Sequence, residues 1–205
     1  MNRNYMLLMA AVASLNVGQI SAAAAVAPAI TCDGEVIVSE RQLTDYVVSQ
    51  IPTELFSAVK QMKAEAQGDA HEPIKQLIES YVGIMATRCC IEACLVVDAR
   101  DKGRQDCTFE DRAEAVSTFE RDLLETIRKD LDGASPEMME QLLKNMEARY
   151  GIKAADIQRE QIEAAAISEG LILYAQQVLE RHTMTLPSKE MELRLAEAVR
   201  LTLQV

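Results

Sequence analysis

Five cysteines are the side chains whose type and spacing could most directly carry chemistry in this sequence. Cys89, Cys90 and Cys94 fall within two helical turns, Cys107 follows after a polar stretch, and Cys32 lies far upstream. In an exported chain such a set predicts a disulfide framework with one thiol left over. The alternative is a metal or redox site, because four thiolates would suit zinc. No C-x-x-C pair occurs and neither histidine is near in sequence, so we predict structural bridges and no metal site.

The elements expected around the cysteines suggest how they pair. Cys94 stands near the end of one predicted helix and Cys107 at the start of the next. An antiparallel hairpin would therefore join them across residues 98–106, and closing such a loop stabilises a fold by about 3 kcal/mol in the chain-entropy model. Cys32 would then tether an N-terminal strand to Cys89 or Cys90, which point to different helix faces.

The other polar residues fit no known catalytic arrangement. None of the serines stands in a nucleophile-elbow pattern, and the sequence has neither a glycine-rich phosphate loop nor a zincin motif. His71 and His182 occur in loop-like or helix-end contexts that favour a surface role. We therefore predict that the protein is not an enzyme and needs no cofactor.

Methionines are the residues that most suggest binding. Met138, Met139 and Met146 share one short predicted helix, and Met184 and Met191 follow. Methionine is flexible and polarizable, so grooves lined by it suit the binding of varied apolar segments. Ordinary filling of a helical core is the alternative interpretation.

Helices must position these side chains. Aromatic residues make up 4% of the chain and Trp is absent, which favours packed helices over a β-sandwich. A β-branched run at 35–38 predicts a strand, and Ser39 with Gln42 predicts a capping box. Apolar spacing, caps and helix-breaking residues predict helices at 40–50, 53–67, 73–97 and 154–182. Two further helices are predicted to begin after a cap at Thr108 and at Ser135–Pro136.

The last segment, after Pro187, has an ambiguous period. Met191, Leu195 and Ala198 suit a helix, whereas residues 199–205 alternate like a strand that could pair with 36–38. The predicted fold class is therefore all-α, a single domain of about six helices. A short pair of N- and C-terminal strands is possible, and disulfides are expected to stabilise the domain.

The N-terminus predicts export. Arg3 supplies a positive charge, residues 6–15 are apolar and residues 21–27 are small, which is the order of regions in a secretory signal. We expect a signal peptide at 1–25 and a mature domain at 26–205, periplasmic or secreted. An uncleaved membrane anchor stays open as an alternative, because no charge occurs between Arg3 and Asp33.

The charge balance excludes some partners. Formal net charge is -11, and 20 basic side chains against 32 acidic ones remain once Arg3 leaves with the signal. An acidic surface repels phosphate backbones and anionic headgroups, so we expect neither nucleic-acid nor membrane-surface binding.

Several segments, in chain order, resemble the N-terminal chaperone domain of SurA-type periplasmic proteins. They are Asp33 to Glu40, Pro73 to Val82, Tyr150 to Ile157, Ile162 to Leu173 and Thr183 to Pro187. The cysteines and the 98–107 loop are not part of that pattern, and no parvulin isomerase domain follows Pro187. The resemblance implies an isomerase-free protein that holds unfolded or envelope-bound polypeptides.

The resemblance and the methionines together lead to the functional prediction of a periplasmic chaperone-like binding protein. Its partners would be unfolded or envelope polypeptides. The alternative is a disulfide-stapled accessory subunit of an envelope secretion or conjugation apparatus, with a single partner in the complex. The residues expected to contact clients are Met138, Leu142, Met146, Tyr150, Ile167, Leu171 and Tyr174.

Overall fold

The computed structural model describes residues 30–65 and 71–205. The predicted signal peptide, and the anchor that is its alternative, lie outside these residues. Within them the chain is mainly α-helical, as predicted, and a small three-stranded sheet accompanies seven α-helices. None of the helices in the described ranges is long and apolar enough to cross a bilayer.

The elements follow one another along the chain in this order. They are β1 (Ile30–Cys32), β2 (Glu35–Val38), α2 (Glu40–Ser49), α3 (Thr53–Glu65), α4 (His71–Asp101), η1 (Phe109–Asp111), α5 (Arg112–Gly133), α6 (Pro136–Tyr150), η2 (Ala154–Asp156), α7 (Arg159–Arg181), β3 (Met184–Thr185) and α8 (Lys189–Thr202).

Local signals place several helix ends where the sequence predicts them. Ser39 caps α2 in a reciprocal box with Gln42, whose side chain accepts from the Ser39 amide at 2.8 Å. Ser135 caps α6, with Pro136 in its first turn, and Gly151 closes that helix at a φ of 66°. These caps satisfy backbone groups that a helix terminus leaves without partners.

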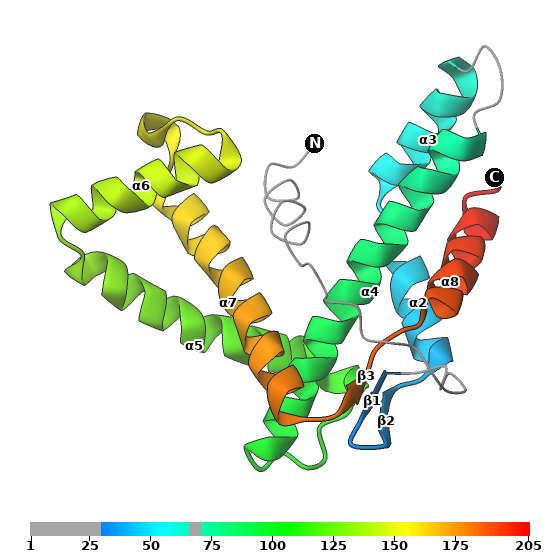
Figure 1. Ribbon diagram of the computed structural model, residues 1–205, viewed down its shortest axis with the longest axis horizontal. Coiled ribbons are helices and arrows are strands. Elements are labelled where there is room, and N and C mark those ends of the chain that lie inside the picture. Colours follow the sequence, from blue (N-terminus) through cyan, green and yellow to red (C-terminus); the bar gives the residue numbers. More distant parts are fainter. Residues whose placement is uncertain (1–29, 66–70) are drawn as a thin grey trace.

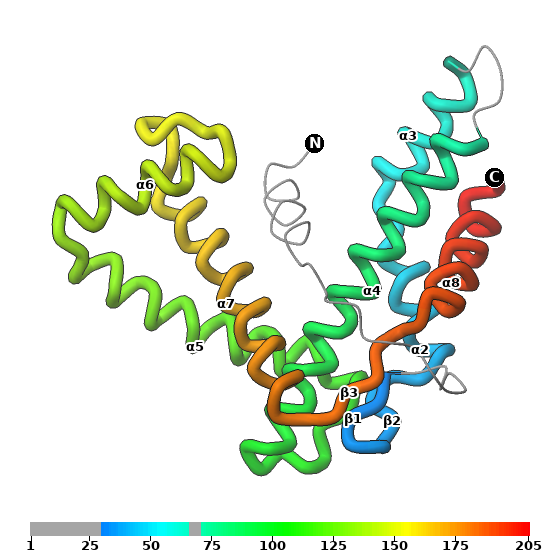
Figure 2. The backbone as a smooth tube through the Cα atoms, viewed as in Figure 1, coloured from blue at the N-terminus to red at the C-terminus, as the bar shows by residue number. Residues whose placement is uncertain are grey.

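Helix α4 is the axis of the fold. Figures 1 and 2 show two limbs that meet at the lower half of α4. One limb, which we call the body, contains the sheet, α2, α3, α8 and α4 itself. The other, which we call the arm, contains α5, α6 and α7. Residues 92–98 of α4 are all buried, because the body covers one side of this segment and the arm another.

Each limb has its own apolar core. The main cluster fills the body, with α2, α4 and α8 contributing Leu43, Ile78 and Leu195 at its centre. A smaller cluster lies in the arm, where Met146 of α6 packs with Ile162 of α7. The arm is thus held by its own contacts beyond the point where it leaves the body.

The C-terminal segment resolves the ambiguous pattern in favour of a helix. Met191, Leu195 and Val199 are buried at a spacing of four residues on α8, and Ser188 caps the helix. The alternative of a strand at 199–205 is wrong, because burying this stripe against the body outweighs a short alternating run. Residues 184–185 supply a strand instead, and they pair with β1 to give the sheet order β2-β1-β3.

Candidate functional site

A groove in the body, open to solvent, lies between α3, α4 and α8. Its volume is about 590 Å³, within the range of roughly 300–1,000 Å³ typical of ligand sites. The lining residues are Lys63, His71, Ile74, Lys75, Ile78, Glu79, Leu193, Ala196, Glu197, Arg200, Gln204 and Val205.

Helix α8 creates this groove by the way it docks. Its buried stripe faces α2 and α4, which leaves Leu193 and Leu201 pointing outward with 50% and 66% of their surfaces exposed. Leu193 lines the groove and Leu201 does not. Ile74 and Ile78 of α4 lie behind the opposing side, with only 7% and 2% of their surfaces exposed. Leu193 is therefore the exposed aliphatic side chain that the groove offers.

Charged side chains surround the apolar part of the groove. Lys63 donates to the carbonyl of Gln204 at 3.2 Å, which ties α3 to the end of the chain. Arg200 forms two hydrogen bonds, of 2.8 and 2.9 Å, with Glu197 one helical turn away. The rim therefore carries both signs of charge, in contrast to the strongly acidic balance of the whole chain.

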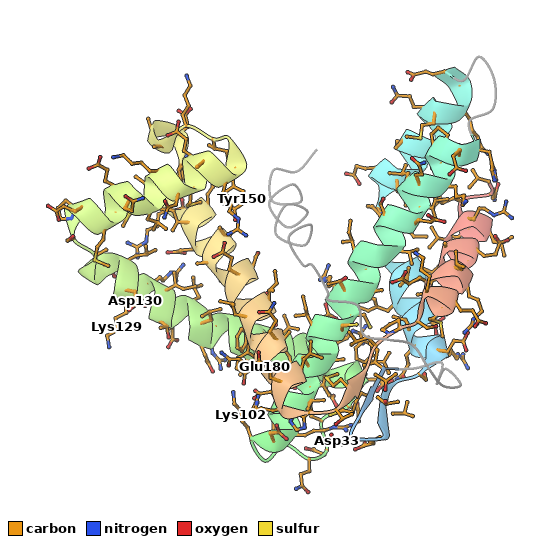
Figure 3. The ribbon with its side chains drawn as sticks, in the orientation of Figure 1. Asp33, Lys102, Lys129, Asp130, Tyr150 and Glu180 are labelled. Carbon is orange, nitrogen blue, oxygen red and sulfur yellow. The ribbon has the colours of Figure 1, made fainter. Side chains whose placement is uncertain are left out.

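The predicted client-binding residues of α6 divide into exposed and buried ones. Met138 is 65% exposed, whereas Met146 is 6% exposed and forms the centre of the arm's cluster. Leu142 and Tyr150 are half-buried and pack against that cluster. Tyr150 lies toward the far end of the arm in Figure 3. Only Met138 of these four therefore offers most of its surface to a partner.

The predicted residues of α7 lie closer to the body. Ile167, Leu171 and Tyr174 are half-buried, and Tyr174 packs on Phe119 of α5 with their ring centroids 4.6 Å apart. The structure thus places the two predicted sets in different parts of the arm, and the groove lies in the body instead. Sequence reasoning missed the groove because its walls come from helices more than a hundred residues apart.

The predicted disulfide framework is absent, since all five cysteines are free thiols. The bridge between Cys94 and Cys107 fails because α4 continues to Asp101, two turns beyond Cys94, before the chain reverses at Gly103. Cys107 therefore lies level with the end of α4, where its carbonyl accepts from Arg100 at 2.6 Å. Cys94 instead has its sulfur 3.7 Å from that of Met184.

The expected tether from Cys32 to Cys89 or Cys90 is likewise not formed. Cys94 is the thiol of α4 near this strand, because its sulfur contacts Met184, the residue that pairs with Cys32 in the sheet. Burial, followed by the neighbouring Asp33 carboxylate, raises the pKa of Cys32 to about 11. A thiol in this environment is protonated at neutral pH unless a cation replaces its proton.

Two buried carboxylates lie where the helices of the two limbs meet, and a third lies within the arm. Glu92 of α4 accepts from Tyr46 and Arg88 and pairs with Arg112 at the start of the arm. Asp98 pairs with Lys102 at 2.8 Å. Each has ionic or hydrogen-bonded partners, as buried charges require. We assign these groups to the architecture and not to chemistry.

The third carboxylate, Glu163 of α7, is fixed within the arm. It accepts two hydrogen bonds from Arg128 of α5, at 3.2 and 3.0 Å, and a third from Arg159 at 3.0 Å. The hydrogen bonds from Arg128 and then from Arg159 lower the pKa of Glu163. The α5–α7 pair is therefore closed by a cluster in which a carboxylate is stabilised in its charged form.

No protein-family model, curated protein or solved structure matches this chain.

Proposed function

We propose that the protein is a non-enzymatic, chaperone-like module that holds apolar segments of unfolded polypeptides. The open groove between α4 and α8 is the observation that carries this proposal. Five of its twelve lining residues are aliphatic, it stands open to solvent, and Leu193 offers an exposed side chain at its edge. Fully burying one side chain of that size is worth about 1.5–3 kcal/mol, whereas millimolar binding needs about 4 kcal/mol. Several apolar side chains of a client must therefore dock together to give weak, reversible binding.

An extended polypeptide segment is the occupant that best suits this groove. The aliphatic lining residues would take its apolar side chains, and the mixed charges of the rim would meet its backbone and polar groups. The arm would provide a second, weaker contact through Met138 and Leu173, which are 65% and 58% exposed. The acidic surface would keep the loaded complex in solution.

A matched pair of substitutions on α8 tests the groove. Leu193→Glu places a charge in the groove, whereas Leu201→Glu places the same charge on the same helix outside it. Both leucines are largely exposed, so neither change should unfold the protein. We expect Leu193→Glu to weaken the binding of an unfolded client tenfold or more and Leu201→Glu to leave it unchanged.

The assay is suppression of client aggregation together with direct binding of a peptide library. Equal behaviour of the two variants would remove the groove from the proposal, and Met138→Glu would then test the arm. A wild-type protein that neither suppresses aggregation nor binds any peptide would overturn the function itself. Crosslinking to one stoichiometric partner in intact cells would instead indicate an accessory subunit of an envelope apparatus.

Export is part of this proposal and depends on the N-terminal sequence. Cell fractionation and N-terminal sequencing test it, with cleavage expected near residue 25. Recovery of the unprocessed chain among cytosolic proteins would contradict both the export and a role among envelope polypeptides.

A further inference from the structure

A group of metal-ligating side chains meets at the base of the molecule, where the turn of the β-hairpin touches the ends of two helices. His182, just after α7, has Nδ1 at 2.9 Å from Oδ2 of Asp33 and Nε2 at 2.8 Å from Oδ2 of Asp101. Cys32 has its sulfur 3.8 Å from that same oxygen of Asp33. One ligand atom each from Cys32, Asp33 and His182 lie within 4.8 Å of one another.

The backbone holds Asp33 in place for this contact. Asp33 and Gly34 have φ angles of 49° and 85°, the conformation of a tight two-residue hairpin turn. The amide of Asp33 donates to the carbonyl of Thr183 at 2.8 Å, and the amide of Thr183 donates to Oδ1 of Asp33 at 2.9 Å. One carboxylate oxygen is thus occupied by the backbone, and the other is directed at His182.

Cys32 is fixed by the sheet. It stands opposite Met184 in the antiparallel pair of β1 and β3, with its side chain 7% exposed. Asp33 lies at the surface beside the sheet, as Figure 3 shows. The cluster therefore combines a buried sulfur with carboxylate and imidazole groups that an ion can reach from solvent.

We propose that Cys32, Asp33 and His182 bind a divalent zinc-class ion. Thiolate, carboxylate and imidazole are all established zinc ligands, and the two anionic donors balance a charge of +2. A tetrahedral zinc site with ordinary bond lengths spaces its ligand atoms about 3.4–3.6 Å apart. The hydrogen-bonded Asp33–His182 pair need open only slightly, and the Cys32 sulfur need move only slightly inward.

Asp101 supports the arrangement through the other ring nitrogen of His182. A histidine that binds zinc usually donates its other ring N–H to a carboxylate, which fixes the tautomer and the ring orientation. The contact from Nε2 of His182 to Asp101 supplies this partner and leaves Nδ1 facing Cys32 and Asp33. On binding, the thiol proton of Cys32 and the Nδ1 proton of His182 leave to solvent, and the ion takes both positions.

Zinc at this site would join three separate parts of the chain. Asp33 belongs to the hairpin turn, Asp101 ends α4, and His182 follows the last turn of α7. Because α7 is part of the arm, the ion would fix the segment between α7 and β3 to the hairpin turn of the body. We therefore expect the melting temperature of the protein to rise when zinc is added.

The experiment uses untagged, reduced protein, titrated with Zn²⁺ against a chromophoric chelator and with Co²⁺ by absorbance. We expect one ion per chain, with a thiolate-to-cobalt charge-transfer band that reports the Cys32 sulfur. His182→Gln and Cys32→Ser should each weaken binding at least a hundredfold. Asp101→Asn should weaken it about tenfold to a hundredfold, as changes to the hydrogen-bond partner of a metal-binding histidine do.

The second histidine of the chain and a second cysteine provide matched controls. His71→Gln and Cys90→Ser should bind zinc as the wild type does. Failure of the wild-type protein to bind either ion, or a Co²⁺ complex without the thiolate band, would overturn the proposal. His182 would then be only an imidazolium that bridges two carboxylates. The wild-type cobalt spectrum needs no variant, so the test stands even if Cys32→Ser does not fold.

Discussion

The hydroxyl of Tyr46 on α2 donates a 2.9 Å hydrogen bond to the carboxylate of Glu92, which α4 buries beside the start of the arm. Arg112, in the first turn of α5, pairs with the other carboxylate oxygen at 3.4 Å. Its guanidinium also lies over the ring of Phe109, 4.5 Å from the centroid. This contact therefore connects the body to the base of the arm through one buried charge.

Tyr46→Phe should destabilise the protein by about 1.5–3 kcal/mol, because the change removes a hydrogen bond to a buried charged acceptor. The measurement is the free energy of unfolding in denaturant. In a Glu92→Gln background the acceptor is neutral, so the same change should cost only about 0.5–1.5 kcal/mol. Equal costs in the two backgrounds would mean that Glu92 is not the partner that matters.

Met146 and Met138 occupy the same helix but should respond differently to substitution. Met146→Ala removes the centre of the arm's cluster and should cost about 2–5 kcal/mol. Met138→Ala alters a side chain that is 65% exposed and should change stability by no more than about 0.5 kcal/mol. Thermal unfolding of both variants distinguishes core filling from a free binding surface on α6.

The arm should lose stability in acid through Glu163. Because the folded state lowers the pKa of this carboxyl below its ordinary value of 4.5, the charged form stabilises the fold above that pH. This contribution disappears as the pH falls below 4.5 and through the lowered pKa. Glu163→Gln should flatten the pH dependence of unfolding in this range, and the exposed Glu140→Gln on α6 should not.

Gly170 allows α5 and α7 to approach closely. A Cβ atom at this position would lie 2.4 Å from a terminal methyl carbon of Leu123 on α5. Gly170→Ala alone gains helix propensity but forces that side chain to move, so its net effect should be small. In a Leu123→Ala background the same substitution should stabilise by about 1 kcal/mol, since only the propensity gain remains.

A double-mutant cycle on chemical unfolding measures the coupling between positions 123 and 170. Strict additivity would mean that the two helices do not touch there, or that Leu123 moves aside without cost.

The amino-acid sequence determined the local features of this protein. Capping boxes, the Ser135–Pro136 start signal and Gly151 at a helix end act over a few residues, so they could be predicted directly. Apolar spacing of three and four residues likewise predicted a chain made mainly of helices. The length of α4 was underestimated, because the polar residues after Val97 suggested a loop where Asp98 is buried and paired with Lys102.

Tertiary structure alone decided which distant residues meet. Asp33 and His182 are 149 positions apart and share a hydrogen bond, and Cys94 faces Met184 instead of Cys107. The groove likewise exists only because α8 returns to lie beside α4. Such contacts depend on how the helices pack against one another. The helical period of a sequence predicts which face of a helix is apolar, but it does not predict which other helix will cover that face.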